Sequence, residues 1–246
     1  MGARANGMAN ASACLSGVWS VHNNIAGLAE TEDVAAGCTY DAVPSAAFFN
    51  RMGAVFAVPL RSGVTAAGIF RFGDDLYNEQ IVSFGFANSF GLASLGLKIN
   101  YCQYRANGLD TRSGVTISFG GIATLTEQLS FGAHIVNINQ PIIRRLTGER
   151  MPTRLIGALA FTPSDKLFLT TDVEKDIEYR PAWKAGMEYR FVKKVAFRTG
   201  FQLHPNAGFF GLGFKARKFN IDYALQFNAL LRTSHQATAT FQFRKP

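Results

Sequence analysis

The stretch "GFFGLGFKARKFNIDYALQF", residues 208–227, decides the fold class. Its apolar side chains alternate with small or polar ones, first from Phe210 to Ala216 and again from Phe219 to Phe227. A period of two residues is that of a β-strand, because successive side chains point to opposite faces. The stretch therefore predicts two consecutive strands, and its two kinds of face suit either a soluble β-sandwich or an outer-membrane β-barrel.

The same alternation recurs from Asp33 to the end of the chain. It predicts an even number of strands with lengths near the roughly 9 to 11 residues that a tilted strand needs to cross a bilayer. The fourteen expected strands lie near 33–42, 52–61, 64–73, 80–90, 92–104, 113–125, 129–138, 153–162, 166–175, 183–191, 195–203, 208–216, 218–227 and 234–244.

Short and long connections are expected to alternate between these strands. The longest lies around 139–152, and the tight ones lie at 61–63, 91–92, 126–128, 162–165, 192–194 and 217–218. This alternation is typical of an up-and-down meander with short periplasmic turns and longer extracellular loops. It predicts that both termini are periplasmic, in the cell outer membrane.

The polar strand faces distinguish the barrel from the sandwich. A water-facing sheet would carry many Lys and Glu residues, whereas these faces hold mostly small and uncharged residues, such as Thr116, Ser118 and Gly120. No apolar run approaches the roughly 18 residues of a spanning helix. We therefore predict an all-β fold: a 14-stranded antiparallel up-and-down transmembrane β-barrel over residues 33–246. The alternation toward Phe243 near the C-terminus is common in barrels delivered to the outer-membrane assembly machinery.

Residues 1–32, called the N-terminal segment below, show no period of two and are rich in Gly, Ala and Asn. The parts "GARANGMANASA" and "VWSVHNNIAGLA" resemble the opening of FadL-type outer-membrane barrels, and more closely their PorV/PorQ-like relatives in Bacteroidota. The matching residues are Gly2, Gly7, Met8, Asn24, Ala26, Gly27 and Leu28, and Ile25 stands where the family often has Pro. The resemblance implies a hatch, or plug, inside the barrel, with Trp19, His22, Asn23 and Asn24 meeting the lumen. The sequence start lacks a signal-peptide pattern, so we expect that an exported protein has already lost its signal peptide.

Charged residues fall on the inward faces of neighbouring strands. Opposite charges on adjacent strands are expected to pair and to close the lumen rather than to conduct ions. The residues are Lys184, Glu188, Arg190, Arg198, Lys215, Arg217 and Asp222. A further alternating set, Asp172, Glu174 and Asp176, is interpreted as a solvated strand end rather than a cation site or a catalytic acid pair.

Motifs for catalysis, metals and nucleic acid are absent from the sequence. The three cysteines and four histidines lack metal-ligand spacing, and there is no GxSxG, P-loop or catalytic triad. The net charge of +8 is spread along the chain without a nucleic-acid motif. We predict no enzymatic activity, no cofactor, no metal and no nucleic-acid partner.

Two hypotheses for function follow. In the first, which the resemblance and the compact loops favour, the barrel is a binding or scaffold subunit of a multi-protein outer-membrane complex linked to type IX secretion. Its partners would be outer-membrane lipid and other outer-membrane or surface proteins. In the second, the barrel is a FadL-type transporter of a hydrophobic small molecule, which passes the hatch and leaves sideways.

Overall fold

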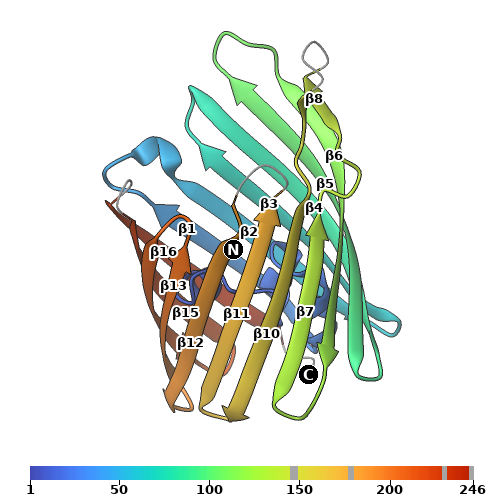
Figure 1. The fold of residues 1–246 in the computed structure, drawn as a ribbon, viewed down its shortest axis with the longest axis vertical. Coiled ribbons are helices and arrows are strands. Elements are labelled where there is room, and N and C mark those ends of the chain that lie inside the picture. Colours follow the sequence, from blue (N-terminus) through green and yellow to red (C-terminus); the bar gives the residue numbers. More distant parts are fainter. Residues whose placement is uncertain (145–148, 177–179, 229–231, 244–246) are drawn as a thin grey trace.

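A computed structural model describes residues 1–144, 149–176, 180–228 and 232–243. Within these residues fourteen strands close into one antiparallel barrel, shown in Figure 1. Each strand pairs with its neighbours along the chain, and β1 closes the barrel against β16, from Val34 opposite Phe243 to Ala42 opposite His235. The predicted up-and-down barrel is therefore confirmed.

All fourteen predicted strands are present in the described part of the chain. The largest difference lies in β4, which begins at Tyr77 rather than near residue 80 because its ladder with β3 continues to the pair Gly73–Asn78. The barrel strands are β1 (Val34–Ala42), β2 (Arg51–Leu60), β3 (Gly63–Gly73), β4 (Tyr77–Phe90), β5 (Ala93–Ala106), β6 (Arg112–Thr124), β7 (Leu129–Val136), β10 (Arg154–Ser164), β11 (Leu167–Asp176), β12 (Ala182–Val192), β13 (Val195–Leu203), β14 (Ala207–Lys215), β15 (Phe219–Asn228) and β16 (Arg232–Phe243).

The elements outside the barrel wall are short. Two strands, β8 (Ile142–Arg144) and β9 (Glu149–Arg150), pair within the predicted loop 139–152, of which 145–148 lie outside the described residues. The helical turns are α1 (Ala3–Asn6), η1 (Val18–Val21), η2 (Ile25–Glu30) and η3 (Ala47–Phe49). None of the helices in the described ranges has the length and apolar character to span a membrane.

The two barrel ends differ less in loop length than the sequence suggests. The turns at 61–62, 91–92, 193–194 and 216–218 lie at one end, called the short-turn end below. At the opposite end, called the long-loop end, the connection at 74–76 is a tight turn in which Asp74 N donates to Tyr77 O (2.9 Å). The strict alternation of short and long connections is therefore wrong at this turn. Strands β4 to β6 rise well above the others at the long-loop end (Figure 1).

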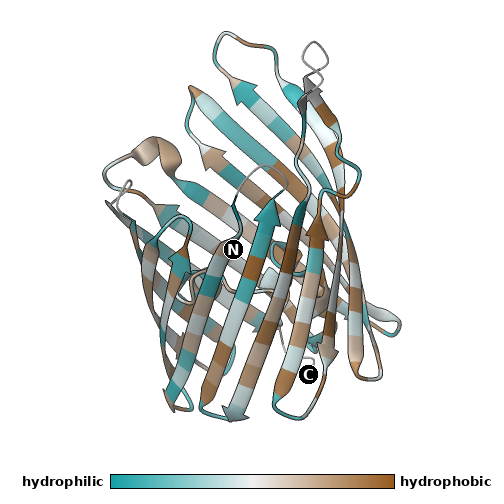
Figure 2. Cartoon of the chain, viewed as in Figure 1, coloured by the Kyte–Doolittle hydropathy of each residue, from teal (hydrophilic) through white to brown (hydrophobic). Residues whose placement is uncertain are grey.

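The outer surface of the barrel is apolar. Figure 2 shows hydrophobic and hydrophilic residues alternating along the strands. Five apolar side chains on the outer faces of β14, β15 and β16 are each 40–50% exposed: Phe210, Phe214, Ile221, Tyr223 and Phe241. The inward neighbours Asp222 and Thr240 are only 8% exposed. An apolar belt around a closed sheet is the surface of a barrel that sits in a lipid bilayer.

Candidate functional site: the lumen and the segment inside it

The N-terminal segment lies inside the barrel, packed against the inward faces of the strands. The core of the molecule is built from this segment, since Met8, Val21, Ile25 and Leu28 are at most 2% exposed. Val21, Ile25 and Leu28 pack with small inward residues of β1 to β4, including Ala57 and Ala66. The lumen is therefore filled by chain rather than by long side chains of the strands.

Glycines on the inward strand faces make room for this segment. A methyl group added to Gly96 of β5 would lie 2.9 Å from the carbonyl carbon of Ile25, and one on Gly211 of β14 would lie 3.1 Å from Gly7 Cα. Gly200 of β13 faces Met8 in the same way, at 2.7 Å. Glycine within a strand often marks the close approach of another backbone. The small residues on the inward strand faces therefore leave room for the backbone of the N-terminal segment.

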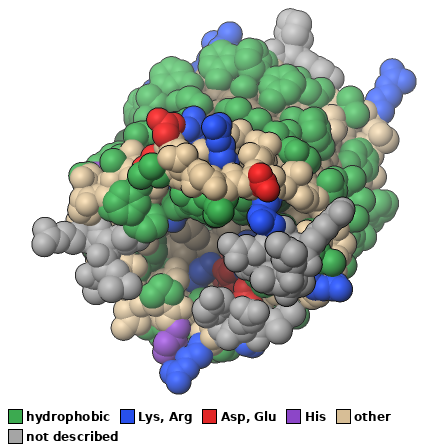
Figure 3. Space-filling model, turned by 90° about the horizontal axis from the view of Figure 1, so that it is seen from above, with side chains coloured by type: hydrophobic (Ala, Val, Ile, Leu, Met, Phe, Trp, Pro, Cys, Tyr) green, Lys and Arg blue, Asp and Glu red, His purple; other side chains and the backbone are tan. Residues whose placement is uncertain are grey.

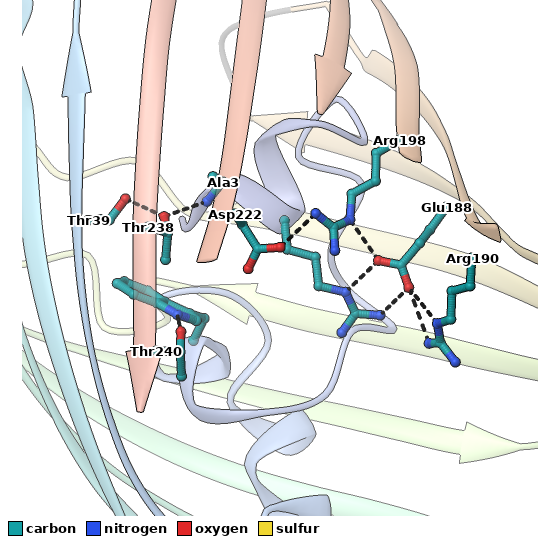
Figure 4. A network of polar contacts seen from close by, with 10 residues as sticks. Ala3, Thr39, Glu188, Arg190, Arg198, Asp222, Thr238 and Thr240 are labelled. Atoms are coloured by element: carbon teal, nitrogen blue, oxygen red, sulfur yellow. Dashed lines mark hydrogen bonds and ion pairs between the residues drawn. The ribbon is translucent and has the colours of Figure 1, made fainter. Parts of the chain in front are cut away.

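Polar anchors tie the start of the segment to β16. Ala3 N donates to Thr238 Oγ1 (2.8 Å), and Trp19 Nε1 donates to Thr240 Oγ1 (2.9 Å). Both threonines are buried on the inward face. Figure 4 shows these bonds beside the charged residues of β12, β13 and β15. Trp19 thus lies against the inward face of β16.

Further anchors fix the segment to the opposite wall. Asn24 Nδ2 donates to Ala13 O (2.6 Å) within the segment and to Gly121 O of β6 (3.1 Å). Lys98, buried on β5, donates from Nζ to Val21 O (2.9 Å). Because Lys98 was not among the predicted site residues, this anchor is one that sequence reasoning missed.

His22 and Asn23 also face the lumen. Asn23 is buried and its Nδ2 donates to Met1 O (3.1 Å). His22 lies against β3, where its ring fills the space beside Gly68. Burial, together with the nearby Lys98, lowers the pKa of His22 to about 3. The imidazole is therefore neutral at physiological pH.

An ion network joins the segment to the barrel through Glu188. Arg4 donates from Nε to Glu188 Oε2 (2.9 Å), and Arg198 donates from Nε to the same oxygen (2.7 Å). Arg190 bonds the other carboxylate oxygen, and Arg198 Nη1 also donates to Asp222 Oδ1 (2.7 Å). These contacts are drawn in Figure 4. The predicted cross-strand pairing is present, and Arg4, which the sequence reasoning missed, completes it.

The carboxylates of β11 are not a solvated strand end, and that interpretation is wrong for two of them. Asp172 is 2% exposed, and its Oδ2 accepts from Ser12 N (2.8 Å) and Ala13 N (3.1 Å). Glu174 forms ion pairs with Lys184 of β12 and Arg154 of β10. The N-terminal segment and the neighbouring strands thus enclose Asp172 and Glu174.

Two predicted inward cations lie at the short-turn end. Lys215 ends β14 and lines the lumen there. Arg217 is exposed in the turn 216–218, so its predicted inward position is corrected, because the alternation of β14 ends at Lys215. Among the described residues, no group of three or more potential ligands is arranged to hold a metal ion.

The segment divides the lumen into cavities. A cavity of about 530 Å³, called the upper cavity below, opens toward the long-loop end. Its wall carries charges of both signs, among them Asp41, Arg51, Lys98 and Glu174. Figure 3 looks into this end, where acidic and basic side chains lie in the hollow. A second cavity of about 460 Å³ lies on the short-turn side, between the segment and β1, β14, β15 and β16. Met1 and Asn23 line both cavities.

The wall beside the upper cavity is partly closed by side chains. The ladder between β6 and β7 stops at the pair Phe119–Ile135. Beyond it, Asn139 Nδ2 donates to Val115 O (2.8 Å) and Asn139 Oδ1 accepts from Ile117 N (2.9 Å). Here the side chain of Asn139 and one backbone hydrogen bond, from Ile138 N to Ile117 O (2.9 Å), take the place of a strand ladder.

Comparisons with solved structures find the same barrel fold in other proteins. The CymD monoaromatic hydrocarbon channel superposes with a TM-score of 0.74 at 12% identity, covering 99% of this chain and 98% of that one. The toluene transporter TodX of Pseudomonas putida gives 0.72 at 12% identity, covering 98% and 97%. A FadL homologue of Pseudomonas aeruginosa gives 0.71 at 10% identity, covering 99% and 98%.

The chain shares the fold of FadL-type channels. No family model matches the sequence, and no curated protein matches it either. The FadL-type half of the predicted resemblance is thus confirmed at the level of fold, and nothing in the comparisons supports PorV/PorQ-like relatives, Bacteroidota or type IX secretion.

Proposed function

We propose that this chain is an outer-membrane channel of the FadL type that passes a small, partly apolar molecule, with residues 1–32 as its plug. One observation carries the proposal: the segment divides the lumen of a closed, apolar-belted barrel into cavities of about 530 and 460 Å³. Cavities on both sides of a seated segment are what a stepwise passage requires. The absence of catalytic and metal motifs from the sequence agrees with a transport role.

The upper cavity supports a molecule with both apolar and polar parts. Its lining includes Phe70, Ile81, Val136, Met151 and Ile156 in addition to the charged groups. Binding sites for small molecules combine an apolar wall with a few polar groups that fix orientation. The names of two similar structures, a monoaromatic hydrocarbon channel and a toluene transporter, agree with an aromatic apolar part.

Passage along the axis requires the segment to move. Its anchors reach β5, β6, β11, β12 and β16, so the state described is closed to an axial route. A sideways exit, as the second hypothesis has it, would run through the seam between β6 and β7, where Asn139 takes the place of a strand partner. Both routes start from the upper cavity, whose lining includes Val136 and Asn137 beside this seam.

The scaffold hypothesis has no observation of its own in its favour. Paired lumen charges and compact loops suit a plugged channel equally well. The outer-membrane partner proteins expected under that hypothesis remain a prediction, which co-purification from native membranes would test.

Uptake into cells that lack their own FadL-type channel tests the proposal. Cells that express the protein should take up radiolabelled toluene or a long-chain fatty acid in a saturable manner, above the level of cells with an empty vector. Folded barrel in the outer membrane is confirmed by the heat-dependent mobility of the protein in gels. Folded protein that raises the uptake of neither probe would overturn the proposal.

A further inference from the structure

A smaller pocket of about 220 Å³ lies at the short-turn end beside the 460 Å³ cavity, with which it shares Arg4, Lys215, Asn220 and Asp222, and its wall is strongly basic. It is formed where the ends of β12, β13, β14 and β15 meet Arg4 of the N-terminal segment. Two carboxylates and six basic side chains line it: Glu188 and Asp222 against Arg4, Arg190, Lys193, Lys194, Arg198 and Lys215.

Both carboxylates already accept hydrogen bonds from arginines. Glu188 accepts from Arg4, Arg190 and Arg198, and Asp222 accepts from Arg198. Lys193, Lys194 and Lys215 form no ion pair within the described residues. The pocket therefore carries an excess of positive charge that the chain itself does not neutralise.

The excess of positive charge makes an anion favourable. Arg198 and Glu188 are at most 4% exposed, whereas the side chains of Arg4 and Arg190 are 33% and 50% exposed and the three lysines are exposed, so an incoming anion can reach them from solvent. A guanidinium offers five N–H donors in a fork that matches the oxygens of a phosphate or a carboxylate. A cleft lined by charges of one sign also concentrates ions of the opposite sign.

We propose that this pocket binds a phosphate group. A phosphate carries up to two negative charges and three strong acceptor oxygens, which suits several cations better than a single carboxylate does. The volume is below that of ordinary small-molecule sites, so it fits a free phosphate or a lipid headgroup rather than a whole transport substrate. The adjoining 460 Å³ cavity has its own acidic rim at Glu30, Glu32 and Asp33, and none of these three lines the phosphate pocket.

This proposal does not rest on the transport function. The site lies on the short-turn side of the segment and is defined by the charged side chains of its wall, whether or not a molecule passes through the barrel. Binding of inorganic phosphate to the purified full-length protein is measured by calorimetry in a non-ionic detergent at low salt. The test variant carries Lys193→Gln, Lys194→Gln and Lys215→Gln. The matched control carries Arg217→Gln and Lys218→Gln, since both residues are exposed in the next turn and do not line the pocket.

A second experiment distinguishes a free phosphate from a lipid headgroup as the ligand. The protein is placed in nanodiscs that contain phosphatidylcholine and phosphatidylglycerol, and the lipids that stay bound are identified by native mass spectrometry. Arg4, Arg190 and Arg198 stay in place in both variants, so the ion network that holds the segment is preserved.

We expect saturable binding that the triple variant weakens about tenfold or more and that the control retains, because each lost hydrogen bond to a charged group changes affinity by roughly that factor. Binding of inorganic phosphate would identify a free anion as the ligand. Retention of phosphatidylglycerol without binding of free phosphate, lost only in the triple variant, would identify a headgroup. Absence of both, or an equal loss in the control variant, would overturn the proposal.

Discussion

Arg4 and Glu188 lie 184 residues apart in the sequence and are joined by two hydrogen bonds, from Nε at 2.9 Å and from Nη2 at 3.2 Å. Glu188 is buried on β12, whereas Arg4 comes from the N-terminal segment. The bond therefore couples the position of the segment to an ion network of the barrel wall. The movement proposed for the segment would have to break this contact.

Replacing Glu188 should loosen the segment more than replacing Arg4. Glu188→Gln removes the carboxylate that Arg4, Arg190 and Arg198 share, and removing one partner of a buried pair costs about 3–5 kcal/mol. Arg4→Ala leaves Glu188 bound by Arg190 and Arg198 and should cost about 1–2 kcal/mol, since Arg4 is one-third exposed.

The rate at which a thiol reagent labels Cys14 measures how readily the segment is released. Burial, together with the nearby Asp172, raises the pKa of Cys14 to about 12, so its reaction with a thiol reagent should be slow while the segment is seated. The labelling rate is measured with Cys38→Ala and Cys102→Ala in the background, and should increase in the order wild type, Arg4→Ala, Glu188→Gln. Faster labelling in Arg4→Ala than in Glu188→Gln would contradict the assigned roles.

A methyl group at Gly96 should displace the segment. In Gly96→Ala the new Cβ would lie 2.9 Å from the backbone of Ile25, and strand β5 cannot yield without breaking its ladders. Gly157→Ala on β10 is the matched control, because nothing lies within 4 Å of a Cβ at that site. Ion conductance in planar bilayers should rise in Gly96→Ala and stay low in Gly157→Ala. Equal conductance of the two variants would show that the glycine does not seat the segment.

Alternation in the sequence was sufficient to predict the barrel wall and the inward positions of Lys184, Glu188 and Asp222. It works because each strand has one face toward lipid and one toward the lumen. Successive residues point to these faces in turn, so the face of one residue fixes the face of every other residue in the strand. It failed at Arg217, where the strand had already ended. It also failed for Asp172, since the groups that enclose this carboxylate are backbone amides of Ser12 and Ala13, 160 and 159 residues away.

The contacts of the N-terminal segment could not be derived from local pattern. Its helical turns are too short to show a period, and its partners lie on strands throughout the barrel. One signal was nevertheless present: Gly96, Gly120, Gly186 and Gly200 occupy inward strand positions. Glycine inside a strand indicates that another backbone comes close, so these positions marked where the segment is seated.

Acidification should release the segment through His22. The pKa of the seated His22 is lowered to about 3 by burial, whereas a released, solvated histidine has a pKa near its ordinary 6.5. Because the released state binds the proton and the seated state does not, stability of the seated state is lost as pH falls from about 6.5 toward 3. The released fraction should increase about tenfold per pH unit in this window.

His22→Gln removes this titration and serves as the comparison. Labelling of Cys14 with 4,4′-dithiodipyridine, which reacts with thiols under acidic conditions, is compared between the two proteins at each pH. Other carboxylates that titrate at low pH affect both proteins equally, so only the difference reports on His22. Identical pH profiles would refute the role of His22.

The two barrel ends should face opposite sides of the membrane. An epitope inserted after Gly108, in the exposed connection between β5 and β6, should be detected by antibody on intact cells. An epitope inserted after Arg217, in the turn between β14 and β15, should be detected only after the outer membrane is opened. Detection in the reverse order would invert the assigned topology.

The apolar belt should tolerate a charge poorly. Ile221, the third residue of β15, is 50% exposed on the outer face, and an arginine that faces lipid costs about 2–4 kcal/mol at the midplane and less toward the interfaces. Asn220, the preceding residue, faces the cavity at the short-turn end, where water can solvate a new charge. Ile221→Arg should therefore lower the free energy of unfolding in lipid vesicles much more than Asn220→Arg does, measured by denaturant titration of the folded barrel. Equal losses in the two variants would mean that the outer face of β15 does not contact the hydrocarbon core of the bilayer.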